Sequence, residues 1–311
     1  MNSRPIEVED VLRTAAVAGA CQLYERSLRA AHGGGGIEGK QKPDGTAVTL
    51  IDMAVEKRMG GILEDMLADS SLVPAIVGEE GTIAGPEGAD YVVFFDPVDG
   101  TALVRLRAPG STTGCSLYDS YGGEFLAGAV ADPWLQRVVF NDRGATYQQQ
   151  FNLSDGTLLG ESKQCEVSEK SFADGGELLI EVVAQGFTRT VFGTGEKRSV
   201  LSQEEATRFS GDVHTKLGTK VRSLSSNLMH QLLVASGGDD TTAIATVMTA
   251  IGGPWDMSGV PLVEGARGTV LYVESGDKFA KTQDPMAADL VICANTKETA
   301  EQVYDVLAAL R

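Results

Sequence analysis

The sequence predicts an α/β protein whose N-terminal half is α+β. Two helical patterns open the chain, over residues 8–31 and 51–69, because apolar side chains in both recur at three- and four-residue spacing. Short apolar runs bounded by Gly and Asp turns follow, as is typical of strands, at 91–95, 113–118, 125–131 and 137–140. In the second half of the chain, strand-like and helical patterns alternate, which is typical of an α/β arrangement.

In that second half, strands are expected at 178–183, 268–274 and 289–293, helices at 223–236 and 297–310, and a short helix between Pro254 and Gly265. The polar, Gly-containing stretch 148–164 is the best candidate for a domain junction. We therefore expect an N-terminal α+β domain over residues 1–155 and a C-terminal α/β domain over residues 156–311.

Composition indicates a cytoplasmic enzyme. The chain has 311 residues, of which 42% are hydrophobic, and no apolar run approaches the roughly 20 residues that cross a bilayer. The polar first ten residues lack the hydrophobic region of a signal peptide. A net charge of -17 argues against nucleic acid or an anionic membrane as partner. A small phosphorylated metabolite remains compatible, because bound divalent cations would invert the local field.

Several kinds of site are poorly supported. The four cysteines include no CxxC pair and the three histidines have no metal-ligand spacing, which disfavours a zinc site or a Ser-His-Asp triad. The glycine run 33–36 lacks the Gly-Lys-Ser/Thr ending of a phosphate-binding loop, which disfavours a kinase or NTPase.

The most informative motif is Asp96-Pro97-Val98-Asp99-Gly100-Thr101. It directly follows the apolar run 91–95 and therefore lies at the end of a predicted buried strand. A carboxylate that ends so apolar a strand needs compensation, and carboxylates three residues apart can share hard cations. The amides of the Gly-Thr turn can meet a phosphate if a helix begins there. The motif therefore indicates metal-assisted phosphoryl chemistry.

Three other segments carry acidic or hydroxyl groups near the ends of predicted elements: Thr49 with Asp52, Gly78-Glu79-Glu80, and Trp255-Asp256. Magnesium prefers oxygen ligands in near-octahedral geometry. Four carboxylates and one backbone carbonyl would be enough ligands for two such ions, which can clamp a phosphate and lower the pKa of a bound water.

In order and content, these segments resemble the superfamily of inositol monophosphatase and fructose-1,6-bisphosphatase, which are magnesium-dependent, often lithium-sensitive phosphatases. The similarity runs from about Lys42 to Gly265. It implies a layered αβαβα sugar-phosphatase sandwich with the active site between its two domains. It also implies Mg²⁺ as cofactor, with two or three ions per site, hydrolysis of a phosphomonoester by a metal-activated water, and a homodimer.

The resemblance also assigns metal ligands. Glu79, Asp96 and the carbonyl of Val98 would hold the first ion. Asp96, Asp99 and Asp256 would hold the second, so that Asp96 bridges the two ions. Glu79 would also assist the attack at a third, weaker site.

Other roles follow from the same resemblance. Asp52 and Thr101 would orient and polarise the attacking water, and the amides of Gly100 and Thr101 would bind the scissile phosphate. Glu80 would support the metal ligands, and Lys42 would be a basic residue of the first loop.

Simpler interpretations exist for several of these residues. Thr49 and Asp52 form the pattern of a helix capping box, and Asp256 could cap the helix that begins there. Glu80 fits a solvated turn, and Lys42 fits an ordinary surface lysine.

The residues that select the substrate are less sharply indicated. Arg105 and Arg107 follow the phosphate-binding turn, where they could meet a second anionic group or simply form an exposed basic segment. Relatives show an Arg-x-Gly-Ser-Ala stretch that contacts substrate, whereas this chain has Ser225 and Ser226 in a divergent run at 222–227. Either serine could donate to a sugar hydroxyl or a ribose.

We therefore expect a small inositol, sugar or polyol phosphate as substrate, fructose 1,6-bisphosphate included. A 3′(2′),5′-bisphosphate nucleotidase is the alternative, since those enzymes share the motifs. A non-catalytic protein that binds metal and sugar phosphate is the alternative from another class.

Overall fold

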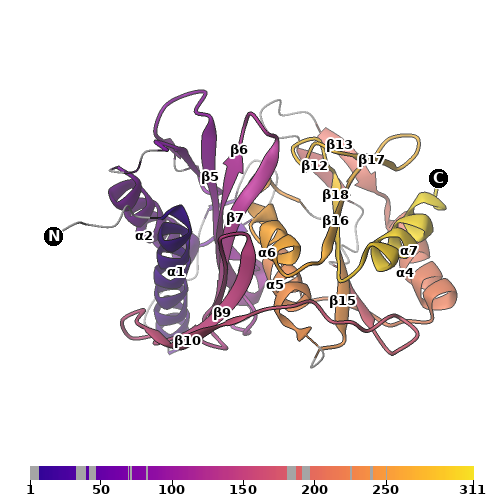
Figure 1. Cartoon of the computed structure of the whole chain (residues 1–311), viewed down its shortest axis with the longest axis horizontal. Coiled ribbons are helices and arrows are strands. Elements are labelled where there is room, and N and C mark those ends of the chain that lie inside the picture. The colour runs from indigo at the N-terminus through magenta and orange to yellow at the C-terminus, as the bar shows by residue number, and fades with distance from the viewer. Residues whose placement is uncertain are drawn as a thin grey trace.

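Two β-sheets and three layers of helices build the molecule (Figure 1). The computed structural model describes residues 7–32, 40–41, 47–68, 70, 72–81, 83–180, 187–190, 197–224, 226–238, 241–249 and 251–311. One helical layer covers the outer face of the first sheet, a second lies between the sheets, and a third covers the far face of the second sheet. This order is the predicted αβαβα sandwich.

The helices of each layer come from different parts of the chain. The outer layer holds α1 (Val8–Ala31) and α2 (Leu50–Leu67). The central layer holds α5 (Asn227–Ser236) and α6 (Val260–Gly265), and the far layer holds α4 (Gln203–Leu217) and α7 (Lys297–Ala308). Two short helices, α3 (Thr101–Arg105) and the 3₁₀ helix η2 (Pro254–Met257), complete the set among the described residues.

The first sheet has eight strands in the order β10-β9-β8-β7-β6-β5-β3-β4. It is antiparallel except where β3 pairs with β5. Its strands are β3 (Ala75–Gly78), β4 (Ile83–Ala84), β5 (Tyr91–Asp99), β6 (Thr112–Asp119), β7 (Glu124–Asp132), β8 (Arg137–Asp142), β9 (Ala145–Phe151) and β10 (Leu158–Gln164).

The second sheet has six strands in the order β14-β11-β15-β18-β16-β17, with β11 parallel to both of its neighbours. Its strands are β11 (Glu177–Ile180), β14 (Val221–Arg222), β15 (Ala243–Met248), β16 (Thr269–Glu274), β17 (Ala280–Thr282) and β18 (Leu290–Ala294). Two small pairs stand apart from both sheets: β1 (Lys40–Gln41) with β2 (Ala47–Val48), and β12 (Phe187–Thr190) with β13 (Lys197–Leu201).

Three apolar cores hold the layers together. The spacing that predicted the first helix puts Val11, Leu12 and Leu23 of α1 fully inside the outer core. Gly19 lies where α1 and α2 cross, because a Cβ there would fall 2.5 Å from the Met59 sulfur. The central core joins both sheets through α5 and α6, so the region between the sheets is packed.

One predicted boundary differs from the structure, and one helix was not predicted. The helix expected at 223–236 begins at Asn227, because Ser226 is extended and its hydroxyl caps the amide of Met229 at 3.1 Å. The strand expected at 178–183 is β11, and residues 181–186 lie outside the described residues. Helix α4 was not predicted, although its Ser202–Glu205 capping box is legible in the sequence.

The stretch 148–164 belongs to the β9–β10 hairpin at one edge of the first sheet. The boundary proposed at residues 155 and 156 falls at the tip of this hairpin, and the division into two domains stays a prediction. In the described part of the chain, no helix combines the length and apolar character that a membrane span requires.

Candidate functional site

A β-bulge shapes the end of β5. Asp96 pairs with Gly114 of β6, but Asp99 pairs with Thr112, so β5 carries one extra residue between these two pairs. Side chains on a regular strand alternate between its faces, and residues three apart would point to opposite sides. The extra residue shifts this alternation by one, which lets Asp96 and Asp99 face the same space. Pro97 fits within the bulge because it has no N–H to contribute to the ladder.

Three carboxylates from this strand end and from η2 converge. One carboxylate oxygen from each of Asp96, Asp99 and Asp256 lies within 4.8 Å of the others. All three side chains are buried. Burial, followed by the charges of neighbouring carboxylates, raises the pKa of Asp96 and of Asp256 well above the ordinary value. In their charged forms these groups therefore oppose folding unless a cation lies among them.

Glu79 contacts this acid cluster (Asp96, Asp99 and Asp256) from the neighbouring strand. It follows β3, and its amide donates to the carbonyl of Phe95 at 3.2 Å, so it stands beside Asp96. Its side chain hydrogen-bonds that of Asp96 and raises the pKa of Asp96 further. Gly78 permits this close approach, since a Cβ there would fall 2.6 Å from the Phe95 ring.

The start of α5 holds Asp99. The Ser226 hydroxyl and the Leu228 amide donate to Oδ2 at 2.5 and 2.6 Å, and the Asn227 amide donates to Oδ1 at 3.3 Å. Burial raises the pKa of Asp99 to about 6, while these donors act in the opposite direction. Ser226 is buried and bonded to Asp99. Its contact with a substrate stays a prediction, and Ser225 lies outside the described residues.

Asp256 is held by the turn that precedes it. Its Oδ2 accepts hydrogen bonds from the amides of Gly252 at 2.5 Å and Gly253 at 3.1 Å. The helix-cap interpretation of this residue is therefore correct as far as these bonds go. It is compatible with metal binding, because these two bonds use only Oδ2. The other oxygen, Oδ1, lies on the side of α5, 3.5 Å from the side-chain nitrogen of Asn227.

Asp52 and Thr101, the pair that the resemblance assigns to the attacking water, are in contact, and that role stays a prediction. The Thr101 hydroxyl lies 2.7 Å from Asp52 Oδ1 and 3.1 Å from the carbonyl of Val98. Asp52 is also the third residue of the capping box at the start of α2, where its other oxygen accepts the amide of Thr49 at 2.8 Å. The capping-box interpretation of Asp52 is therefore confirmed, and it uses one oxygen while the other bonds to Thr101.

The turn after Asp99 brings the chain into α3. Gly100 has φ 87°, a left-handed conformation that strains other residues. The first amides of a helix have no partner within it, so those that follow Gly100 are available to an acceptor. Arg105 and Arg107 are exposed, and neither forms an ion pair with any residue that the structure describes. Their contact with a substrate stays a prediction.

A buried glutamate was missed by the sequence analysis. Glu56 is 4% exposed, and its carboxylate accepts the amide of Glu80 at 2.8 Å, which fixes the turn that carries Glu79. The four-residue spacing from Asp52 to Glu56 places both on one face of α2 and could have revealed it. The supporting role of Glu80 stays a prediction, and Lys42 lies outside the described residues.

His230 anchors the segment that leads into α5. Its ring is fully buried, and Nε2 accepts the amide of Leu224 at 3.0 Å, which ties down the segment before α5. Burial lowers the pKa of His230 to about 4, so the ring is neutral at pH 7.

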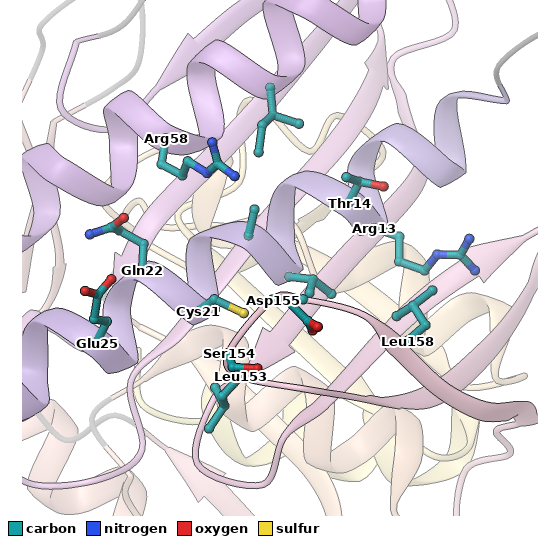
Figure 2. Close-up of a pocket in the computed structure, with 14 residues that line it drawn as sticks. Arg13, Thr14, Cys21, Gln22, Glu25, Arg58, Leu153, Ser154, Asp155 and Leu158 are labelled. Atoms are coloured by element: carbon teal, nitrogen blue, oxygen red, sulfur yellow. The ribbon is translucent and has the colours of Figure 1, made fainter.

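A cavity of about 500 Å³ lies elsewhere, on the outer side of the first sheet (Figure 2). Residues of α1 and α2 line it together with the tip of the β9–β10 hairpin. Figure 2 shows Cys21 in its wall, with Arg58 and Asp155 nearby. None of its lining residues belongs to the acid cluster, so this cavity is not the candidate site.

The donor set of the acid cluster fits a hard divalent cation. Its groups are carboxylate oxygens, the ligands that such ions prefer, and the cluster is buried where unpaired negative charge is costly. Each carboxylate is fixed by hydrogen bonds or by its strand. The arrangement can thus hold one or more cations beside the Asp52–Thr101 pair.

Comparisons with known proteins agree with this fold. The sequence profile described as the inositol monophosphatase family matches residues 7–310. Similar solved structures include the extragenic suppressor protein suhB of Bartonella henselae, with a TM-score of 0.70 and 17% identity, covering 96% of this chain and 98% of that chain. Another is the IMPase of Thermotoga maritima, with a TM-score of 0.64 and 19% identity, covering 98% of both chains. A third is SaIMPase-II with inositol monophosphate bound, with a TM-score of 0.61 and 13% identity, covering 94% of this chain and 91% of that chain. No curated protein sequence matches the chain significantly.

Proposed function

The chain belongs to the inositol monophosphatase family, and we propose that it is a Mg²⁺-dependent hydrolase of small phosphate monoesters. The observation that carries this proposal is the convergence of three buried carboxylates within 4.8 Å. Three buried negative charges would destabilise the fold unless a bound cation neutralises them. Membership of a family of phosphatases supplies the reaction class.

We assign the metal ligands as the resemblance implies. Glu79, Asp96 and the Val98 carbonyl hold one ion, and Asp96, Asp99 and Asp256 hold another. Two Mg²⁺ ions, with a third beside Glu79 in some states, would neutralise the phosphoryl oxygens and lower the pKa of a bound water. Asp96 hydrogen-bonds Glu79 and lies within 4.8 Å of Asp99 and Asp256, which supports its assignment as the shared ligand.

The Asp52–Thr101 pair is assigned to the attacking water. The Thr101 hydroxyl donates to Asp52, so its oxygen can accept a hydrogen bond from a water molecule on its other side. Asp52 keeps that hydroxyl oriented and would accept its proton as the Thr101 oxygen takes one from the water, so that the proton lost by the water ends on the Asp52 carboxylate. The amides of Gly100 and Thr101 would then bind the phosphate oxygens in line with the attack.

The substrate proposed is a monophosphate of inositol, a sugar or a polyol. SaIMPase-II, a structural relative, was solved with inositol monophosphate bound, which supports this class. The remaining contacts are assigned to Ser225, Ser226, Arg105 and Arg107. If an arginine binds a second phosphate, the substrate is a bisphosphate, as fructose 1,6-bisphosphate or a 3′-phosphorylated adenosine nucleotide would be.

A panel of phosphate esters tests the proposal. The purified protein is incubated with inositol 1-phosphate, fructose 1,6-bisphosphate, a polyol phosphate and adenosine 3′,5′-bisphosphate, with Mg²⁺ or with EDTA, and released phosphate is measured. We expect metal-dependent turnover of at least one ester. Metal binding without turnover of any ester would support the non-catalytic alternative. Light scattering of the same sample tests the homodimer.

Replacement of Asp96 by Asn should abolish turnover, with a loss of about 1,000-fold or more, because the shared ligand loses its charge. The metal-free variant should melt no lower than the metal-free parent, since the substitution relieves repulsion among buried carboxylates. Asp142→Asn, which changes an acidic residue outside the cluster, is the control. Full activity in the Asp96→Asn variant would remove Asp96 from the metal site.

A further inference from the structure

We propose that one face of α5, formed by Asn227 and Gln231, is a positioning face that holds Asp256 against Asp99 and so sets the affinity of the site for Mg²⁺. The inference rests on the metal-binding function proposed above. Neither residue was identified from the sequence motifs. Both side chains are amides on a helix that otherwise contributes mainly apolar groups to the central core.

Both amides reach the same residue of η2. Asn227 and Gln231 are four positions apart and therefore project from one face of the helix. The side-chain nitrogen of Asn227 lies 3.5 Å from Asp256 Oδ1, and that of Gln231 lies 2.7 Å from the main-chain carbonyl of Asp256. One amide thus restrains the carboxylate and the other restrains the backbone that carries it.

The same helix end also restrains Asp99. The main-chain amides of Asn227 and Leu228 both donate to the Asp99 carboxylate. Asp99 comes from the first sheet and Asp256 from the segment that follows the second sheet's β15. The η2 helix also packs directly on β5, and α5 adds to that packing a single helix end that bonds to both carboxylates.

The burial of Gln231 calls for such an explanation. Its side chain is fully buried, and a buried amide costs about 1–3 kcal/mol unless it is hydrogen-bonded. The chain also leaves room for it, because Gly259 approaches so closely that a Cβ there would fall 2.4 Å from Gln231 Oε1. A leucine at this position would fill the core but would leave the carbonyl of Asp256 without this donor.

Two substitutions test the side-chain amides apart from the main-chain amides of α5. Asn227→Ala removes the contact with Asp256 Oδ1 but keeps the main-chain N–H that donates to Asp99. Gln231→Met keeps the length and approximate volume of the side chain but removes the donor. Ser236→Ala, at the other end of α5, is the matched control.

The dissociation constant of Mg²⁺ is measured by calorimetry and by the metal-induced rise in melting temperature, with no substrate present. Removal of groups that support metal ligands costs 10–100-fold in affinity, so we expect about 10-fold weaker binding for each single variant. The loss of Mg²⁺ affinity in the double variant should be smaller than the product of the losses in the two single variants, because both groups act on Asp256. Turnover, where measured, should recover at saturating Mg²⁺, and Ser236→Ala should bind Mg²⁺ as the parent does.

The outcomes distinguish this inference from the proposed function. If the parent protein binds Mg²⁺ and both single variants bind it as tightly as the parent does, the positioning face is refuted, whatever their melting temperatures. If the parent binds no Mg²⁺ at all, the proposed function fails first. Should Gln231→Met fail to fold, Asn227→Ala still decides the matter, since it removes only a short side chain.

Discussion

Thr101 and Asp52 illustrate how single residues acquire a role from their neighbours. They are 49 positions apart in the chain, and their side chains meet at 2.7 Å because α2 and β5 pack together. Asp52 Oδ2 is occupied by the Thr49 amide, which orients Oδ1 toward Thr101. A residue that caps a helix is thereby also a fixed acceptor beside the acid cluster.

This geometry predicts the behaviour of two variants of Thr101. Thr101→Ala loses the hydroxyl that orients the water and should lower kcat about 100-fold, whereas Thr101→Ser keeps the hydroxyl and should stay within about 10-fold of the parent. Phosphate release at saturating Mg²⁺, read as kcat and KM separately, makes the comparison. Equal activity of the two variants would show that the hydroxyl has no part in the reaction.

At the scale of elements, the contact between β7 and the η2–α6 segment positions Asp256. Gly128 of β7 lies beneath this segment, and a Cβ there would fall 2.2 Å from the carbonyl of Ser258 and 2.9 Å from Pro261. Backbone atoms cannot yield as a flexible side chain can. The absence of a side chain at Gly128 therefore lets the segment that carries Asp256 lie directly on the first sheet.

Two glycine-to-alanine substitutions test this contact. Gly128→Ala should destabilise the protein by about 1–3 kcal/mol and weaken Mg²⁺ binding, because it pushes the η2–α6 segment away from the sheet. Gly61→Ala, in α2 where a Cβ would meet nothing within 4 Å, should instead be neutral or stabilise by up to about 1 kcal/mol. Denaturant unfolding of both variants checks this. An unchanged free energy of unfolding for Gly128→Ala would mean that the segment is not held at this contact.

At the scale of the whole molecule, an ion pair joins Arg311 to Glu205 of α4 in the far helical layer. Arg311 Nε lies 2.6 Å from Glu205 Oε1. The same guanidinium donates to the carbonyl of Val200 at 2.8 Å and stacks on the Phe279 ring, 4.4 Å from its centroid. Hydrogen bonds from Arg311, assisted by Ser202, lower the pKa of Glu205 to about 2. The far layer is therefore fastened partly by charge.

The pKa of Glu205 sets the pH at which this fastening is lost. Because the folded value lies below the ordinary 4.5, the pair stabilises the protein above about pH 4.5 and stops doing so as the pH falls to 2. Glu205→Gln should cost about 1 kcal/mol at pH 7 and progressively less toward pH 2.5. Unfolding of both proteins across that range, with the exposed neighbour variant Glu204→Gln as control, measures the difference. A cost that stays constant with pH would mean that the charge of Glu205 contributes nothing.

Local patterns in the chain were sufficient for most of its helices, for the central strands of the first sheet and for its main motif. Apolar spacing predicted α1, α2 and the central strands because one face of each must be buried. The Asp96–Thr101 motif, Glu79 and Asp256 could be selected as candidate ligands because ligand chemistry restricts residue types. Helix α4 was missed even though its capping box is a local signal.

The three-dimensional arrangement added what no local pattern contains. The bulge in β5, the position of Ser226 on Asp99, and the burial of Glu56, His230 and Gln231 all depend on which elements pack together. Sequence spacing describes neighbours along one helix or strand, whereas a metal site needs groups from several elements at hydrogen-bonding distance. Those distances follow from the packing of two sheets around α5, and only the folded chain contains that packing.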